Sequence, residues 1–249
     1  MAENLILVAA AFLAGILNSI AGGGTFLTFP ALVYVGVPPV VANATSTVAV
    51  FPGYASAAAG FRRELASLGR RDLVRIALIM LAGGLVGSLA LLISSNRVFS
   101  AIVPFLLLIA TITFAFQDRI RAWTQASGKS VKPQGALGAL LVSTYGGYFN
   151  GGLGIILLSL FSLWGMRDMH TMNGLKSGMS FVISAISVAT FAIAGIIRWP
   201  EALMMALASV AGGFAGASLA RVLGRRIVRI IVIITGLTMS TIFFLRIFW

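Results

Sequence analysis

The chain has 249 residues, of which 59% are hydrophobic and only 10% are charged, and its mean hydropathy is +1.03. Soluble domains carry about 25% charged residues, so this sequence lacks the polar surface that keeps a domain in water. Several apolar runs approach the roughly 20 residues that cross a bilayer, which predicts a multi-pass helical membrane protein. The net charge of +12 does not indicate a nucleic-acid partner, because the basic residues lie in short loops between apolar runs.

The first half of the chain predicts five apolar segments, at 4–20, 26–35, 41–60, 73–93 and 99–116. The turn between the second and third segments contains Pro38 and Pro39, which cannot continue a helix. A polar connector at 117–134 follows the fifth segment. We therefore expect a first membrane repeat over 1–116, followed by a linker.

The second half repeats this plan with segments at 135–149, 153–164, 171–197, 201–223 and 227–248. The stretch 82–90 recurs as 211–220, shifted by 129 to 130 positions. A constant shift of 130 also places Gly22, Gly24 and Asn43 on Gly152, Gly154 and Asn173. Agreement at one offset across several segments indicates an internal repeat, with the second copy over 135–249.

Basic residues define the orientation. Loops 61–72, 117–134 and 221–229, together with Arg75, hold 13 of the 18 Lys and Arg residues, so these loops should be cytoplasmic. The hairpin of the first two segments then opens from outside and that of segments six and seven from inside. We predict an all-α integral membrane protein with two inverted repeats, each opened by a broken or re-entrant hairpin. The short second and seventh segments favour re-entry over full crossing.

Two glycine-rich breaks interrupt the apolar pattern, one at the tip of each hairpin. The first, 18–25, has three consecutive glycines, and the second, 145–154, has five glycines in all. At membrane depth, the freed N–H groups and the N-termini of the following segments form a suitable site for an anion. The alternative is that these glycines only allow helices to pack closely. We interpret the two breaks as halves of one site.

Lys176 is the only cation well within an apolar run. It could provide positive charge for an anionic substrate, or its side chain could extend to the cytoplasmic surface. Hydroxyl and amide groups beside the breaks and at the openings of segments three and eight could donate hydrogen bonds. The candidate substrate-binding residues are Asn18, Ser19, Gly22, Gly23, Gly24, Thr25, Asn43, Thr45, Ser46, Asn150, Gly151, Gly152, Gly154, Asn173, Lys176 and Ser177.

All six acidic residues lie at segment ends or in loops: Glu3, Glu64, Asp72, Asp118, Asp168 and Glu201. Carriers coupled to protons or sodium usually keep an intramembrane carboxylate, so uphill uptake is poorly supported. With the cell interior negative, an anion that leaves gains about 2.3 kcal/mol per charge per 100 mV. Export or exchange of an anion is therefore favoured.

Other classes of protein have less support. One histidine, no cysteine and no nucleophile or metal motif leave an enzyme without catalytic groups, and neither a metal nor another cofactor is expected. A scaffold without transport would not need broken hairpins. Small residues at spacing four, such as Gly83/Gly87 and Gly212/Gly216, permit close helix packing within the chain or in a homodimer. We expect His170 to be solvated, with pH sensing as the alternative.

The glycine break 21–25, Pro30, the Pro38-Pro39 pair, 42–46 and the second break 151–154 resemble the TauE/SafE sulfite-exporter family of bacterial membrane permeases. The resemblance covers essentially the whole chain. It implies an inner-membrane protein whose hairpins line a central site and which moves sulfite, a sulfonate or a related sulfur-containing anion by alternating access. Lys176 matches no family motif, so its role depends on the physical argument alone. A carboxylate or neutral substrate, or uptake, is the alternative.

Overall fold

The computed structural model describes residues 1–20, 23–126, 135–219 and 225–248. Within these residues the chain forms eleven α-helices and no strand. The helices are α1 (Ala2–Ile20), α2 (Thr25–Tyr34), α3 (Pro39–Gly60), α4 (Arg62–Ser67), α5 (Arg70–Ile93), α6 (Asn96–Ala126), α7 (Ala136–Tyr148), α8 (Leu153–Leu163), α9 (Met169–Ile193), α10 (Trp199–Leu219) and α11 (Arg225–Phe248). The predicted all-helical fold is confirmed.

Each predicted segment corresponds to a helix, but three details differ. The short helix α4 occupies part of a predicted loop. Helix α6 continues to Ala126, because residues 117–126 contain neither Gly nor Pro to end it, so the connector begins later than expected. Helix α9 ends at Ile193, before the expected residue 197, and Gly195 with a φ of +70° follows its end. The rest of the connector, 127–134, lies outside the described residues.

Helices α3 and α9 form the centre of the molecule and pack against each other. Helix α3 also contacts α10, and α9 contacts α5, while α1 packs on α10 and α7 packs on α5. When each helix is replaced by its counterpart in the other half (α1 by α7, α3 by α9 and α5 by α10), the same set of packed pairs results. Phe51 of α3 stacks on Phe181 of α9, with ring centroids 5.1 Å apart and planes 11° apart. These two residues are 130 positions apart, as expected where equivalent positions meet on a two-fold axis. The inversion across a membrane stays a prediction.

Glycines allow the closest helix pairs to touch through their backbones. A Cβ on Gly87 of α5 would lie 2.1 Å from the carbonyl oxygen of Thr144 in α7. A Cβ on Gly212 of α10 would lie 1.9 Å from the carbonyl oxygen of Phe12 in α1. The small residues of these helices therefore serve packing within one chain.

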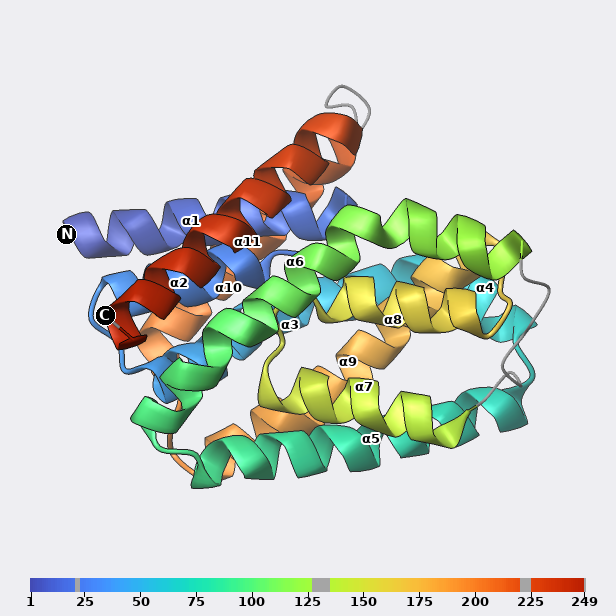
Figure 1. Cartoon of the computed structure of the whole chain (residues 1–249), viewed down its shortest axis with the longest axis horizontal. Helices are drawn as coiled ribbons and strands as arrows, with labels where there is room; N and C mark the ends of the chain where they lie inside the picture. The colour runs from blue at the N-terminus through green and yellow to red at the C-terminus, as the bar shows by residue number, and fades with distance from the viewer. Residues whose placement is uncertain (21–22, 127–134, 220–224, 249) are drawn as a thin grey trace.

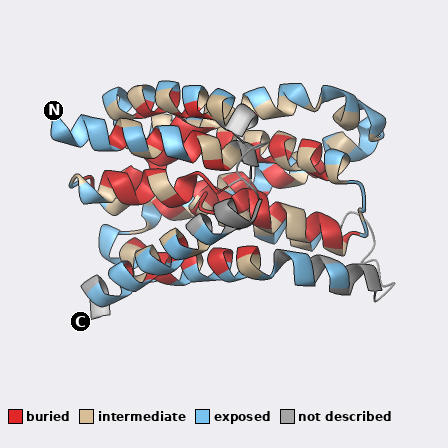
Figure 2. Cartoon of the chain, turned by 90° about the horizontal axis from the view of Figure 1, so that it is seen from above, coloured by how far each residue is buried: buried red, intermediate tan, exposed pale blue. Residues whose placement is uncertain are grey.

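Burial is arranged as in a membrane bundle. Figure 2 shows buried residues concentrated between the helices and exposed residues on the outer faces, and many of the exposed ones are large and apolar, such as Leu78, Leu207 and Phe214. Among the described residues, three helices are long and apolar enough to cross a membrane: Arg70–Ile93, Asn96–Phe116 and Met169–Ile193. Together with the helical fold, these spans support a multi-pass membrane protein.

The second arms of both hairpins are short. Helices α2 and α8 have 10 and 11 residues, or about 15–17 Å at 1.5 Å per residue, about half of a bilayer's hydrocarbon core. In Figure 1, α2 lies towards the end of the molecule that carries the N-terminus, and α8 lies towards the opposite end. The two hairpins therefore extend from opposite ends and bring their tips to the middle of the bundle.

Candidate functional site

The tips of the two hairpins touch each other. The hydroxyl of Thr25, at the start of α2, donates a hydrogen bond of 3.1 Å to the backbone carbonyl of Asn150. A Cβ on Gly152, at the start of α8, would lie 3.2 Å from the ring of Phe26. Residues 125 positions apart in sequence thus form one junction, which we call the tip junction (Thr25, Phe26 and 150–152).

Asn150 connects the tip junction to both central helices. Its side chain is 2% exposed. Its amide oxygen accepts a hydrogen bond of 3.2 Å from the Tyr54 hydroxyl of α3, and its amide nitrogen donates one of 3.0 Å to the Ser184 hydroxyl of α9. Because a buried amide is costly unless it is hydrogen-bonded, these two hydroxyls hold the second tip in one orientation.

Other predicted site residues also bond within the protein. The N–H of Gly24 donates to the Asn18 side-chain oxygen at 2.9 Å, and the Asn43 amide donates to the Tyr148 carbonyl at 2.9 Å. The hydroxyls of Thr28 and Ser46 lie 2.6 Å apart. The Gly24 bond closes the first tip, the Thr28–Ser46 contact joins α2 to α3, and the Asn43 bond joins α3 to the second hairpin. A ligand at these positions would have to replace internal hydrogen bonds.

Most first-turn N–H groups at the tips bond to nearby carbonyls: those of Phe26, Leu27 and Thr28 to Gly23 and Gly24, and those of Leu153, Ile155 and Ile156 to Asn150 and Gly152. No side chain caps α2 at Gly24 or α8 at Gly152. Gly152 has a φ of +71°, a left-handed conformation that suits glycine and turns the chain sharply into α8. The aligned peptide dipoles of a helix still leave partial positive charge at its N-terminus. Both tips therefore present a positive electrostatic end to the centre of the bundle.

The polar residues of α9 form a stripe along one helical face. Asn173, Ser177, Ser180, Ser184 and Ser187 follow one another at spacings of three and four, so they lie on one side of the helix. The four serines are buried. The stripe begins near the N-terminus of α9 and reaches the tip junction at Ser184.

Lys176 lies on the same face of α9, one turn before Ser180. Among the described side chains it is the only Lys or Arg that is not exposed, and it is half-buried. No carboxylate in the described part of the chain forms an ion pair with it. At the opposite end of the bundle, Arg198 pairs with Glu201 on the surface at 3.3 Å.

The remaining predicted residues are placed as follows. Thr45 is buried and its hydroxyl accepts a hydrogen bond from the Arg198 N–H at 3.2 Å. Asn173 is half-buried, and Gly23, Gly151 and Gly154 are buried. Gly22 lies outside the described residues, and so does the side chain of Ser19.

Sequence reasoning missed Tyr54, Tyr145, Ser180 and Ser184. The Tyr145 hydroxyl donates to the Gly151 carbonyl, which fixes the backbone of the second tip. Two signals were available: the three- and four-residue spacing of the serines, and the 130-residue shift, which pairs Tyr54 with Ser184. Both of these residues bond the same Asn150 side chain.

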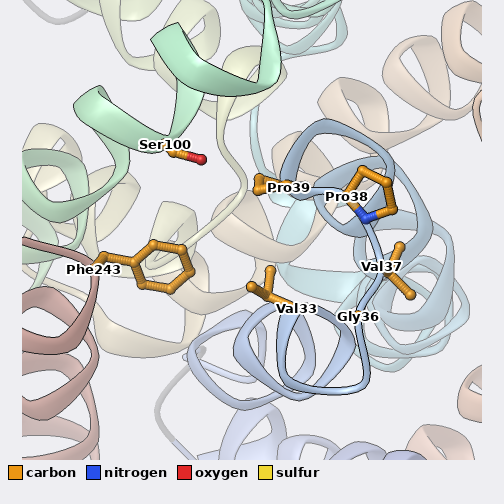
Figure 3. Close-up of a pocket in the computed structure, with 7 residues that line it drawn as sticks. All are labelled: Val33, Gly36, Val37, Pro38, Pro39, Ser100 and Phe243. Carbon is orange, nitrogen blue, oxygen red and sulfur yellow. The ribbon is translucent and has the colours of Figure 1, made fainter. Parts of the chain in front are cut away.

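A cavity of about 290 Å³ lies away from these residues, beside the α2–α3 turn (Figure 3). It is lined by Val33, Gly36, Val37, Pro38, Pro39, Ser100 and Phe243. Only Ser100 contributes a side-chain hydroxyl, and no predicted site residue lines the cavity. The cavity is therefore separate from the candidate site.

The helices have apolar outer faces, the second arms of both hairpins are about half the length of a membrane span, and a polar stripe lies inside the bundle. These features are typical of a helical membrane protein of the transporter type. A model of the family described as "Sulfite exporter TauE/SafE" matches residues 7–242. The chain belongs to this family, which confirms the resemblance seen in the glycine breaks.

Several curated proteins are similar to this chain over most of their length. A "Probable membrane transporter protein" of Haemophilus influenzae is 29% identical, covering 94% of this chain and 92% of the relative. "Probable membrane transporter protein ORF9" of Sinorhizobium sp is 27% identical, covering 94% and 89%. "Probable membrane transporter protein YfcA" of Escherichia coli K12 is 26% identical, covering 94% and 87%. No solved structure matches the chain. The names of these relatives agree with a transporter and not with an enzyme.

Proposed function

We propose that this protein is a secondary transporter of small anions that exports sulfite, a sulfonate or a related sulfur-containing organic anion. The observation that carries the proposal is Lys176, a half-buried cation without a carboxylate partner on the polar face of α9. A half-buried charge is unfavourable unless a counter-charge or water is present. An anionic substrate would provide the counter-charge.

The route passes from Lys176 along the serines of α9 to the tip junction. The uncapped N-termini of α2 and α8 would stabilise the anion there. Alternating access would separate the tips so that the junction opens to one side of the membrane at a time. In this cycle the substrate would replace the Thr25–Asn150 hydrogen bond, one of the contacts that now close the junction.

The proposed setting is a bacterial inner membrane with the arginine-rich end inside. Helix α4, which carries exposed Arg62 and Arg63, packs against the first turns of α9. The positive-inside rule then places the N-terminus of α9 and Lys176 near the cytoplasm. An inside-negative potential would favour export by about 2.3 kcal/mol per charge per 100 mV.

The first experiment is a thermal-shift screen of the purified protein against sulfite, sulfate, thiosulfate, taurine, sulfoacetate and matched carboxylates. A ligand that binds the folded state raises the apparent Tm by mass action. We expect a sulfur-containing anion to raise the Tm, and Lys176→Met to remove the shift. Arg63→Met is the matched control, because it removes an exposed cation near the same end of the bundle.

The screen separates this proposal from its alternatives. Stabilisation by carboxylates alone would change the substrate class, and stabilisation only by a neutral solute would refute the anion site. Direction is tested in proteoliposomes loaded with the stabilising anion. An inside-negative potassium diffusion potential should accelerate its efflux, and faster accumulation under that potential would refute export.

A further inference from the structure

We propose that Lys176 and Ser180 form an anion subsite for a single negative charge, so that the protein carries monoanions and rejects dianions of the same size. This inference rests on the proposed function and specifies the charge of the substrate. It depends on one unpartnered hydroxyl and on the distribution of charged residues in the bundle.

Ser180 supplies the hydroxyl. Its side chain is 0% exposed, and its Oγ is one of only two buried side-chain polar atoms in the described residues without a hydrogen-bond partner. Other serines of α9 are bonded, Ser184 to Asn150 and Ser187 to the carbonyl of Ile183. A buried hydroxyl without a partner is unfavourable, so it points to a position where a ligand oxygen could accept its hydrogen bond.

Lys176 lies next to this hydroxyl. Residues four apart on a helix have Cβ atoms about 5–6 Å apart, so an ammonium and a hydroxyl at these positions can contact the same oxyanion. Two neighbouring residues of α9, Met179 and Ile183, belong to a buried apolar cluster on one flank of this position. On the other flank, Phe181 stacks on Phe51. The polar groups at this position of α9 therefore come mainly from Lys176 and from the serines on the same face.

Among the side chains that the structure describes, Lys176 is the cation that is not exposed, and it supplies one unit of positive charge to this subsite. Every other Lys and Arg whose side chain is described is exposed. Glu64 of α4 lies against this part of α9, since its Cβ is 3.5 Å from the position that a Cβ on Gly174 would take. Gly174 and Lys176 are two positions apart and therefore face nearly opposite sides of α9. Glu64 does not neutralise Lys176.

The two halves of the chain differ at this subsite. The 130-residue shift pairs Lys176 with Ser46 and Ser180 with Val50. Ser46 is bonded to Thr28, and Val50 has no polar group. The repeat therefore does not supply a second cation at the equivalent position in α3.

One half-buried cation with an apolar cluster on one flank discriminates by charge. A monoanion forms a neutral pair with Lys176, whereas a dianion keeps one negative charge without a partner away from bulk water. An uncompensated buried charge is strongly unfavourable. We expect a dianion to bind roughly a hundredfold more weakly than a monoanion of the same shape.

The test compares methanesulfonate with sulfate, which share a tetrahedral SO₃ group and differ by a methyl group in place of one charged oxygen. Binding to the full-length protein in detergent is measured by calorimetry, with the thermal shift as a second readout. Methanesulfonate should bind, and sulfate should bind roughly a hundredfold more weakly or not at all. Sulfate binding as tightly as methanesulfonate would overturn the inference, while the proposed anion transport would stand. Binding of neither these nor any other anion would overturn the proposed function as well.

Variants locate the subsite. Ser180→Ala should weaken methanesulfonate binding about tenfold, the loss of one hydrogen bond to a charged group, and Lys176→Met should abolish binding. Ser162→Ala is the matched control, because this buried serine of α8 already donates to the Leu158 carbonyl of its own helix. If the Ser180→Ala variant binds methanesulfonate as tightly as the unmodified protein does, Ser180 is not part of the site. The comparison of the two anions needs no variant, so it remains decisive if a variant fails to fold.

Discussion

Gly152 should tolerate even one added methyl group poorly. Its φ of +71° costs an L-residue about 1–2 kcal/mol. A Cβ there would also lie 2.8 Å from the Cβ of Ala110 and 3.2 Å from the Phe26 ring, and such overpacking costs about 1–3 kcal/mol. Gly152→Ala should therefore lower the free energy of unfolding by about 2–5 kcal/mol.

Gly195 is the matched control for this substitution. Its φ is +70°, nearly the same as that of Gly152, but a Cβ there would meet nothing within 4 Å. Gly195→Ala should cost only the backbone term, about 1–2 kcal/mol. The difference between the two variants isolates the packing of Gly152 against Phe26 of the other tip and Ala110 of α6.

The assay is reversible denaturant or thermal unfolding of the purified protein in one detergent, followed by circular dichroism. A second comparison adds Ala110→Gly to both backgrounds, because this change removes the nearest atom that the new methyl group meets. In a double-mutant cycle, Ala110→Gly should recover part of the loss in Gly152→Ala and none of it in Gly195→Ala. Equal losses at the two glycines, or no recovery, would refute the packing of the tip junction described here.

Three further outcomes are expected. Tyr54→Phe leaves the Asn150 amide oxygen buried without its 3.2 Å partner, so it should lower the free energy of unfolding by about 1–3 kcal/mol in the same assay; an unchanged value would contradict the bond. The Thr171 hydroxyl and N–H, which bond the Asp168 carboxylate, hold the pKa of Asp168 below its usual range. This carboxylate therefore stabilises the fold fully above its unfolded pKa and loses that effect as the pH falls through the folded pKa, so the Tm advantage over Asp168→Asn should disappear in acid. Gly87→Ala should destabilise the α5–α7 contact, whereas Gly53→Ala, where a Cβ meets nothing within 4 Å, should raise stability by up to about 1 kcal/mol; a shared sign would contradict the close packing of α5.

The helices could be predicted because their signal is local. Long apolar runs and glycine or proline breaks set most helix ends, and the short second arms of the hairpins were evident from the position of Thr25 and Leu153 just after the breaks. Helix α4 was missed because only one of its six residues, Leu65, is large and apolar, so the helix carries no apolar periodicity. The extension of α6 was missed because charge was taken to indicate a loop, although charged residues are compatible with a helix.

The candidate site could be predicted only in part. The glycine breaks and Lys176 stand out within apolar runs, so these residues could be named from the sequence. The partners of Asn150 could not, because Tyr54 and Ser184 lie on different helices and meet it only through tertiary packing. Whether a serine hydroxyl finds a hydrogen-bond partner also depends on its tertiary neighbours. The sequence therefore does not reveal that Ser187 has a partner and Ser180 has none.

The hydrogen bonds of Asn150 should limit the leakage of ions through the protein. The backbone carbonyl of Asn150 holds Thr25, and its side chain holds Tyr54 and Ser184, so one residue engages α2, α3 and α9 together. Moving the second tip strains all three hydrogen bonds at once, which makes partial opening costly and favours a cooperative, all-or-none transition. A carrier with this coupling should spend little time in a half-open form that admits ions from both sides, and so it should preserve the membrane potential that its own export would use.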